Sequence, residues 1–109
     1  MRFYSLDSTP FKPVTHDPEL KKQVLVPEGF SCVKHISHIT LDPGSTASSH
    51  YHDAVYEVFY CIIGEAVFRV SGRKVQLTRG NCLVVEPGEF HEIAEVREVT
   101  ELLYLHAAP

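Results

Sequence analysis

The stretch that organises this chain is residues 44–64, which read GSTASSHYHDAVYEVFYCIIG. His50 and His52 stand two residues apart in it, and side chains two apart on a strand leave the same face, with Cα atoms roughly 6.6 Å apart. Two ring nitrogens at that separation can converge on one ion at the ~2.0–2.1 Å bond lengths that are typical of zinc, for example. The spacing predicts that the two imidazoles share one ligand site.

Glu57 lies five residues beyond His52, which is out of phase for a continuous strand. The intervening residues 53–56 must therefore turn or bulge to return the carboxylate to the same face. A β-rich run follows, so the two histidines would end one strand and Glu57 would begin the next. The resulting nitrogen and oxygen ligands suit iron, manganese, nickel, zinc or copper.

Residues 44–64 resemble the first sequence motif of the cupin superfamily. That motif is a glycine, five residues, His-x-His, three or four residues, Glu, six residues and a glycine. The stretch from Gly44 to Gly64 matches it in full.

A second cupin motif is matched more loosely. Gly80, Gly88 and His91 fall in register with it, while Glu86 stands at its first proline and Glu95 at its asparagine. These departures concern the turn and the strand around the motif, and the histidine that the family uses as a ligand is present as His91.

The resemblance implies an all-β fold, a double-stranded β-helix forming a compact jelly-roll-like barrel with the metal inside. It also implies one divalent metal ion with coordination positions left for water, dioxygen or substrate. An open position makes a metal site chemical rather than structural. The implied metal ligands are His50, His52, Glu57 and His91.

The rest of the chain also predicts an all-β class. Runs rich in Val, Ile, Phe and Tyr alternate with turn residues such as Asp42-Pro43-Gly44, and no 11-residue window shows a helical period. Many short strands at near-regular spacing favour an antiparallel sandwich or barrel. The expected strands are 24–26, 32–41, 57–63, 66–71, 74–78, 82–85, 91–96 and 99–106.

The length of 109 residues fits one domain. Residues 1–23 contain three prolines and little periodicity, which predicts an extended N-terminal arm with at most one helical turn. Residues 24–109 would form the cupin barrel. Residues 24–26 read Val-Leu-Val and make a good edge strand, and because a second copy can cover such an edge, we expect a homodimer.

Composition argues against several classes of function. Ten Lys and Arg against 14 Asp and Glu give a formal charge of −4, which disfavours nucleic acid and anionic membranes as partners. No run approaches the ~20 apolar residues that span a bilayer, and the first residues lack a signal-peptide run, so we expect a cytoplasmic protein. The three separated cysteines predict neither a disulfide framework nor a cysteine zinc site.

Strand periodicity extends the predicted site beyond the metal ligands. If Glu57 points inward, so do Phe59 and Cys61, which would either line a substrate cavity or pack in the core. If His91 points inward, so does Glu95, which would hydrogen-bond a ligand imidazole or accept a proton. The alternative is that the strand ends before Glu95 and leaves it solvated.

The other histidines have no predicted role in the site. His35 and His38 cannot share a face of a regular strand because their separation is odd, so we expect a surface or satisfied pair. His16 and His106 have no recognisable partners.

The charges near the predicted site disfavour strongly anionic substrates. Glu86, Glu89 and Glu92 lie close to His91 and give the mouth of the site a negative charge, unless they form no more than a solvated turn. The first motif also supplies no lysine or arginine that would bind a carboxylate or phosphate.

The barrel alone does not identify a reaction, because one fold hosts many activities. Family analogy suggests a dioxygenase-type oxidoreductase that uses iron(II). The same ligands would also suit an isomerase, lyase or decarboxylase, in which manganese, nickel or zinc polarises a carbonyl or enolate. A third possibility is a non-catalytic module that binds a small organic ligand as a sensor or carrier. The expected partner is a small molecule in all three.

Overall fold

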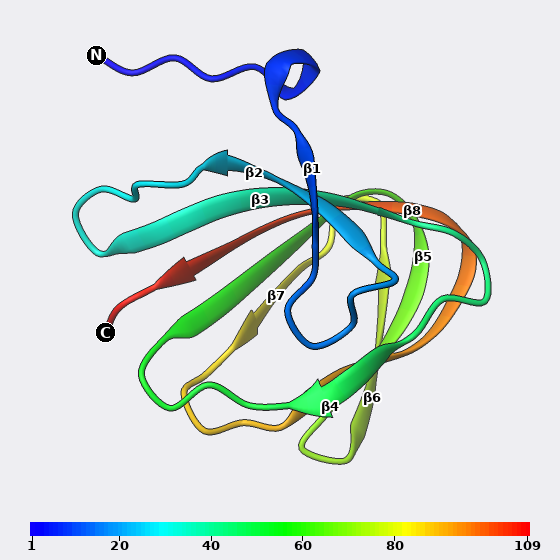
Figure 1. The fold of residues 1–109 in the computed structure, drawn as a ribbon. Helices are drawn as coiled ribbons and strands as arrows, with labels where there is room; N and C mark the ends of the chain where they lie inside the picture. Colours follow the sequence, from blue (N-terminus) through cyan, green and yellow to red (C-terminus); the bar gives the residue numbers. More distant parts are fainter.

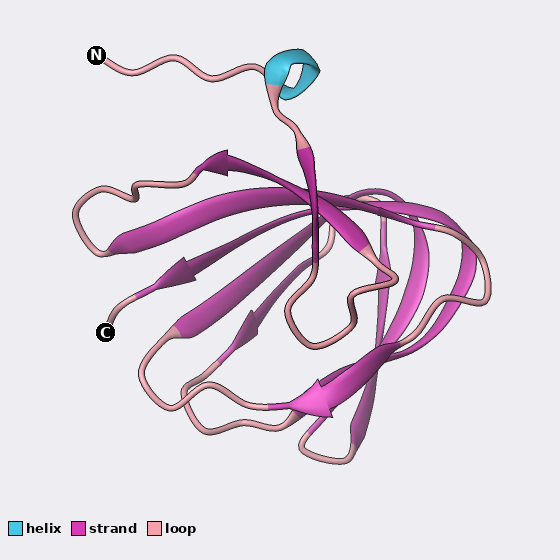
Figure 2. Ribbon diagram, viewed as in Figure 1, coloured by secondary structure: helices cyan, strands magenta, loops and turns pink.

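Alternation of apolar and polar residues between glycine turns produces eight antiparallel strands and no α-helix (Figures 1 and 2). The computed structural model describes residues 1–109. A 3-10 turn, η1, spans Leu6–Ser8 and is too short to cross a lipid bilayer, as no helix here is long and apolar enough to do so. The strands are β1 (Phe11–Pro13), β2 (Lys21–Val26), β3 (Val33–Leu41), β4 (Ala47–His50), β5 (Tyr56–Val70), β6 (Arg73–Thr78), β7 (Cys82–Val85) and β8 (His91–Ala107).

The strands hydrogen-bond in the order β1-β2-β3-β8-β5-β6, with β4 added to β8 and β7 added to β5. The 15-residue β5 and the 17-residue β8 each bend and take part in both faces of the barrel (Figure 1). The first part of β5 pairs with β7 and its last part pairs with β6, while β8 pairs first with β4 and later with β3. This folded antiparallel sheet is the jelly-roll barrel that the sequence predicts.

Two pairs of expected strands are in fact single strands. The ranges 57–63 and 66–71 fall in β5 apart from Ser71, which begins the turn after it, and the ranges 91–96 and 99–106 lie in β8. At Gly64 the chain bends without reversing, with φ of 105°, and a Cβ there would collide with the Val99 carbonyl and with Thr100. Glycine therefore lets the two long strands stay paired through the bend.

The segment expected as an extended arm, residues 1–23, contains η1, β1 and the first half of β2. Gln23 of β2 is buried, and its side-chain amide donates to the carbonyls of Leu6 and Thr9 at 3.0 and 2.9 Å. These bonds attach the start of the chain to the edge of the barrel.

The loop between β1 and β2 is attached to β4 by a buried carboxylate. Asp17 accepts a hydrogen bond from the hydroxyl of Ser48 at 2.7 Å and another from the Ser48 backbone N–H at 3.2 Å. Val14 and Leu20, at the two ends of this loop, pack against the hydrophobic core. The loop therefore covers one side of the barrel interior with a fixed set of side chains.

The hydrophobic core fills the space between the two faces of the barrel. Phe68 is its largest fully buried side chain, and its ring lies 5.0 Å from that of Phe59, centroid to centroid. The buried cluster comprises Ile39, Leu41, Phe59, Cys61, Ala66, Phe68, Val70, Leu77, Val85, Ile93, Val96, Leu102 and Tyr104.

Candidate metal centre and substrate cavity

Four side chains meet inside the barrel, and each can offer one metal-ligating atom. They come from four places in the chain: the end of β4, the loop that follows it, the start of β5 and the start of β8. Their ligating atoms all lie within 4.8 Å of one another. The group consists of His50, His52, Glu57 and His91, the set that the cupin motifs imply.

The two-residue spacing of His50 and His52, and the loop that joins β4 to β5, explain this convergence locally. β4 ends at His50, and His52 lies in the short loop before β5, so only the first histidine is part of a strand. The loop then returns the chain so that Glu57 enters β5 facing inward, with only 5% of its surface exposed. His91 starts β8 and pairs directly with His50 across the sheet.

In all three imidazoles, the ring nitrogen Nε2 either faces the centre of the group or is free to turn toward it. Nδ1 of His50 donates to the Ser48 carbonyl at 2.8 Å, and Nδ1 of His91 donates to the Glu89 carbonyl at 3.1 Å. Backbone carbonyls therefore hold the δ nitrogens and leave Nε2 for a ligand. Nε2 of His52 is buried with no hydrogen-bond partner and lies 3.5 Å from Glu57 Oε1.

This donor set fits a divalent metal ion. A buried nitrogen without a partner costs about 1–3 kcal/mol, and a metal at the centre would satisfy the one on His52. His91 Nε2 donates to Glu57 Oε1 at 2.8 Å, and a metal would replace the proton between them because coordination requires deprotonated ligands. Three imidazoles and one carboxylate are ligands that first-row transition metals accept.

A fourth histidine, His106, holds the carboxylate from its other side. Strand register places Glu57 opposite His106 and His106 opposite His35, so the three side chains form one row across the inner face. Nε2 of His106 donates to Glu57 Oε2 at 2.7 Å, which leaves Oε1 to face His52 and His91. Sequence reasoning missed His106 because its partner is set by the register of β5 and β8.

The charges of the group follow from this geometry. Burial opposes ionisation of Glu57, but hydrogen bonds from His106 and His91, together with the nearby His52, hold the pKa of its carboxyl well below the ordinary value. Burial lowers the pKa of His50. Burial is also the largest influence on His91, but the hydrogen bonds to Glu57 and to the Glu89 carbonyl, with the negative charges of these two residues, together outweigh it and raise the pKa of His91. An anionic carboxylate beside a neutral imidazole is the state that metal coordination requires.

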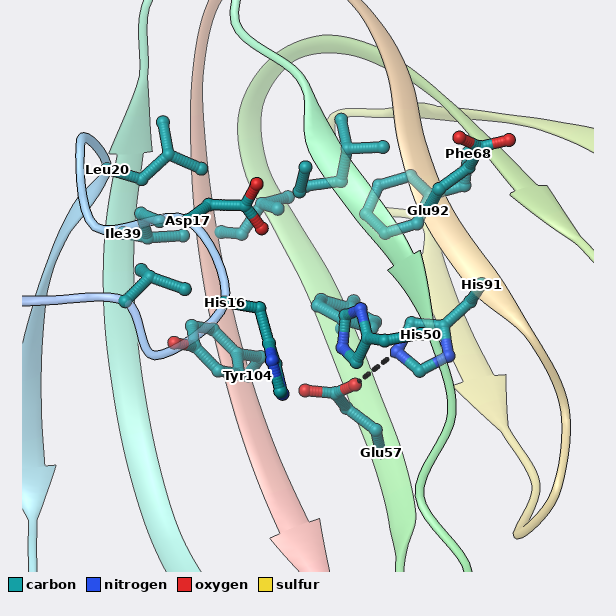
Figure 3. Close-up of a pocket in the computed structure, with 15 residues that line it drawn as sticks. His16, Asp17, Leu20, Ile39, His50, Glu57, Phe68, His91, Glu92 and Tyr104 are labelled. Atoms are coloured by element: carbon teal, nitrogen blue, oxygen red, sulfur yellow. Dashed lines mark hydrogen bonds and ion pairs between the residues drawn. The ribbon is translucent and has the colours of Figure 1, made fainter.

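An apolar cavity of about 80 Å³ lies against these ligands (Figure 3). Phe59 lines it, as one of the two alternatives from periodicity predicts. Cys61 belongs to the other alternative, since it is fully buried in the core and does not line the cavity. The apolar side chains that line it are Val14, Leu20, Ile39, Ala47, Phe59, Phe68, Ile93, Leu102 and Tyr104.

The inward placement expected for Glu95 is wrong. Its side chain is 55% exposed, and its carboxylate accepts a hydrogen bond from Arg97 at 3.1 Å. The register of β8 against β5 shifts between Ile93 and Glu95, so β8 holds one extra residue there. This bulge inverts the alternation, and Val96 takes the inward position instead.

Three of the histidines without a predicted role lie beside the site, namely His16, His35 and the His106 described above. His16, on the loop between β1 and β2, has its ring centroid 5.0 Å from that of His50 (Figure 3). His35 lies beside the site, with its ring 4.4 Å from that of His106. As expected, His35 and His38 lie on different faces of β3 and both have partners: Ser37 Oγ lies 3.2 Å from Nδ1 of His35, and Glu101 lies 3.0 Å from Nε2 of His38.

His106 and Glu95 allow a paired prediction. Replacing His106 by phenylalanine should lower metal affinity by ~10–100-fold, because Glu57 loses the donor that orients it. Glu95→Gln should leave metal affinity unchanged, because that side chain points into solvent. Competition with a chromogenic chelator measures both affinities, and an equal loss in the two variants would contradict this assignment.

Because of His35, we expect the free energy of unfolding of the metal-free protein to depend on pH. Burial first, and then the nearby His106, lower the pKa of His35 from 6.5 to about 4. Lys22 adds to this depression and Glu57 opposes it. Because the unfolded chain protonates at higher pH than the folded one, stability contributed by neutral His35 is present above pH 6.5 and lost as pH falls through about 4.

Denaturant unfolding between these pH values tests the assignment. Metal-free wild type should lose more stability than His35→Phe, by on the order of 1–2 kcal/mol after allowance for solvent screening. Parallel stability curves for the two proteins would show that His35 does not titrate in this way.

Known proteins resemble the chain in sequence and in fold. Residues 37–106 match the family described as the cupin domain. The oxalate-binding protein of Thermotoga maritima is 33% identical over 57 residues, 52% of this chain and 47% of that protein. Tetracenomycin polyketide synthase protein TcmJ of Streptomyces glaucescens is 34% identical over 74 residues, 68% of this chain and 50% of that protein. The chain thus matches about half the length of these curated relatives.

The fold resembles that of KdgF from Halomonas sp., with a TM-score of 0.85 and 15% identity. The match covers 100% of this chain and 94% of that chain. At this identity the likeness concerns the fold alone.

Proposed function

The chain belongs to the cupin family, and from that membership we propose that it binds one divalent metal ion and acts on a small organic molecule. The observation that carries the proposal is the convergence of three imidazoles and one carboxylate beside a cavity inside the barrel. The proposed metal ligands are His50, His52, Glu57 and His91.

The residues around the ligands would prepare the site for chemistry. A bound metal would supply a Lewis acid beside the cavity. Backbone carbonyls orient His50 and His91, and His106 orients Glu57. Apolar side chains around the cavity limit the access of water, which strengthens electrostatic interactions inside it.

For the reaction we propose a dioxygenase-type oxidation that uses iron(II). Support comes from the ligand set, since imidazoles and a carboxylate that leave open positions are typical of non-haem iron oxygenases. Elemental analysis of the purified protein should find about one metal ion per chain. Iron(II) reconstitution under anaerobic conditions, followed by oxygen-electrode measurements with candidate substrates, should then show dioxygen consumption that zinc-loaded protein lacks.

Two outcomes of this experiment would count against the proposal. Failure of the purified chain to bind any of iron, manganese, nickel, zinc or copper would remove the metal site. Substrate turnover without dioxygen, with manganese, nickel or zinc bound, would contradict the dioxygenase reaction. It would indicate an isomerase, lyase or decarboxylase instead.

A second candidate is a metal-loaded binding module without turnover. The observation that favours it is the 33% identity to a protein named for binding oxalate. Calorimetric titration of the metal-loaded chain with oxalate tests this function. Saturable binding with no change in the recovered ligand would support a sensor or carrier.

We also propose that the chain assembles as a homodimer through the edge of β2. β1 pairs with β2 only through Lys21–Gln23, so residues 24–26 have no strand neighbour on that side. Exposed apolar side chains lie in the neighbouring segments, including Phe3 in the N-terminal region and Phe30 in the turn between β2 and β3. Sedimentation equilibrium at tens of micromolar should give a dimer, and a monomer throughout that range would rule out this assembly.

A further inference from the structure

A second cavity, of about 150 Å³, also borders Glu57 and is rich in hydrogen-bond donors. Five histidines, Tyr104 and Lys22 line it. Glu57 is the single acidic residue in this lining. Once a divalent metal offsets the charge of Glu57, the cavity carries net positive charge and suits an anionic group.

Lys22 reaches this cavity because of the register of β2 against β3. It pairs with Ile39, whose side chain lines the apolar cavity, so Lys22 lies on the inner face of the barrel. The sequence region around the first motif contains no cation, and the barrel supplies one from a strand at the other end of the sheet. Strand pairing therefore adds a charge to the site that motif reading does not find.

The ammonium group of Lys22 has no partner within the chain. It makes none of the ion pairs or side-chain hydrogen bonds of the structure, whereas the neighbouring Lys21 donates to the Pro18 carbonyl at 3.0 Å. Burial, and then repulsion from Lys12, lower the pKa of Lys22, while the negative charge of Glu57 raises it. A partly buried cation without a counter-ion is costly, and an anionic ligand would remove that cost.

The donor-rich cavity and the apolar cavity meet at the metal ligands. His16, His50, Glu57 and Tyr104 line both of them. One molecule could therefore place a charged group beside Lys22 and a hydrocarbon group among the core side chains, with its middle beside the metal ligands. A ligand of that kind has one anionic end and an apolar body.

We propose that this site binds a small organic carboxylate, with its carboxylate beside Lys22 and its hydrocarbon body in the apolar cavity. The proposal rests on the proposed function, because the two cavities adjoin at the metal ligands. It names the substrate class that the motifs leave open. It also differs from simple oxyanion binding, since oxalate and phosphate have no hydrocarbon body for the apolar cavity.

The glutamates near His91 do not prevent this binding. None of Glu86, Glu89 and Glu92 lines the donor-rich cavity. Glu92 is paired with Arg69 at 2.9 Å, and Glu89 accepts a hydrogen bond from the backbone N–H of Glu86 at 2.9 Å. Glu92 does line the apolar cavity, but its carboxylate is held by Arg69, and the cavity beside Lys22 contains none of the three glutamates.

Zinc-loaded protein provides a test that is independent of redox chemistry. Zinc binding is measured first, by calorimetry, so that loss of the metal site is recognised separately as a failure of the proposed function. Acetate, butyrate, hexanoate, hexanamide, oxalate and inorganic phosphate are then titrated into the zinc-loaded chain. We expect hexanoate to bind more tightly than acetate, with a gain of about fourfold for each buried methylene.

Two lysine variants separate binding at Lys22 from binding by the metal alone. Lys22→Met should weaken hexanoate binding by ~10–100-fold, the usual range for loss of one charged hydrogen bond. Lys21→Met removes the same charge from the adjacent position and should leave hexanoate affinity unchanged. Lys22→Arg should restore part of the affinity, and the binding of hexanamide should respond to none of the three variants.

Several results would overturn the inference while leaving the metal site intact. Equal affinity of wild type and Lys22→Met for hexanoate, with zinc bound, would show that the lysine does not hold the carboxylate. Equal affinity for hexanoate and hexanamide would show that the cavity does not select an anion. Tighter binding of oxalate or phosphate than of hexanoate would show that the apolar cavity does not take part.

Discussion

Replacement of His52 by alanine is expected to remove most of the bound divalent metal while the barrel stays folded. His52 presents a buried Nε2 with no partner in the chain, so its contribution to the site is available only to a ligand. Loss of a direct ligand should weaken metal affinity by more than the ~10–100-fold that is typical of losing a residue behind the ligands. Metal content after dialysis and chelator competition measure the effect.

His38→Ala is the matched control for this variant. This variant also lacks one imidazole. In the wild type, however, the side chain of His38 pairs with Glu101, away from the metal ligands. Its metal content should equal that of wild type, and the far-ultraviolet circular dichroism of both variants should remain that of a β protein. Near-stoichiometric metal in His52→Ala would refute the four-ligand site.

Replacement of Phe68 by alanine is expected to be the most destabilising change in the core. The side chain is fully buried, contacts the ring of Phe59 and lines the apolar cavity. Phenylalanine to alanine changes at such positions cost ~3–5 kcal/mol, because apolar contacts are lost and a larger void remains. For a domain of this size the Tm should fall by more than about 10 °C.

Phe90→Ala is the control for the loss of an aromatic ring. Phe90 is 55% exposed and contacts Tyr51 with ring centroids 4.8 Å apart. Its removal should change the free energy of unfolding by no more than about 0.5 kcal/mol. Urea unfolding of both variants, with metal absent, compares the two costs, and similar values would show that Phe68 is not central to the core.

Local spacing in the sequence predicts much of the metal centre. His50 and His52 are two residues apart and Glu57 follows across a short loop, so these three converge through local geometry that period-two reasoning captures. The turn residues and β-branched runs predict an all-β barrel for the same reason, because both depend on steric preferences within a few residues.

Periodicity fails where a bulge intervenes. Counting by two from His91 places Glu95 inside, but one extra residue in β8 turns it outward and brings Val96 inward. Bulges depend on how the partner strand β5 bends, and a single strand's sequence does not contain that information.

By itself, the sequence determined the family, the barrel and the group of four side chains that can hold a metal ion, because short-range spacing and motif patterns specify each of them. The tertiary structure alone decided which distant side chains complete the site. Lys22 on β2 and His106 on β8 reach it through strand register, since β2, β3, β8 and β5 are neighbours in the sheet although they are far apart in the chain. Register is a property of paired strands, so the charge and the hydrogen bonds around the ligands emerge only once the strands are paired.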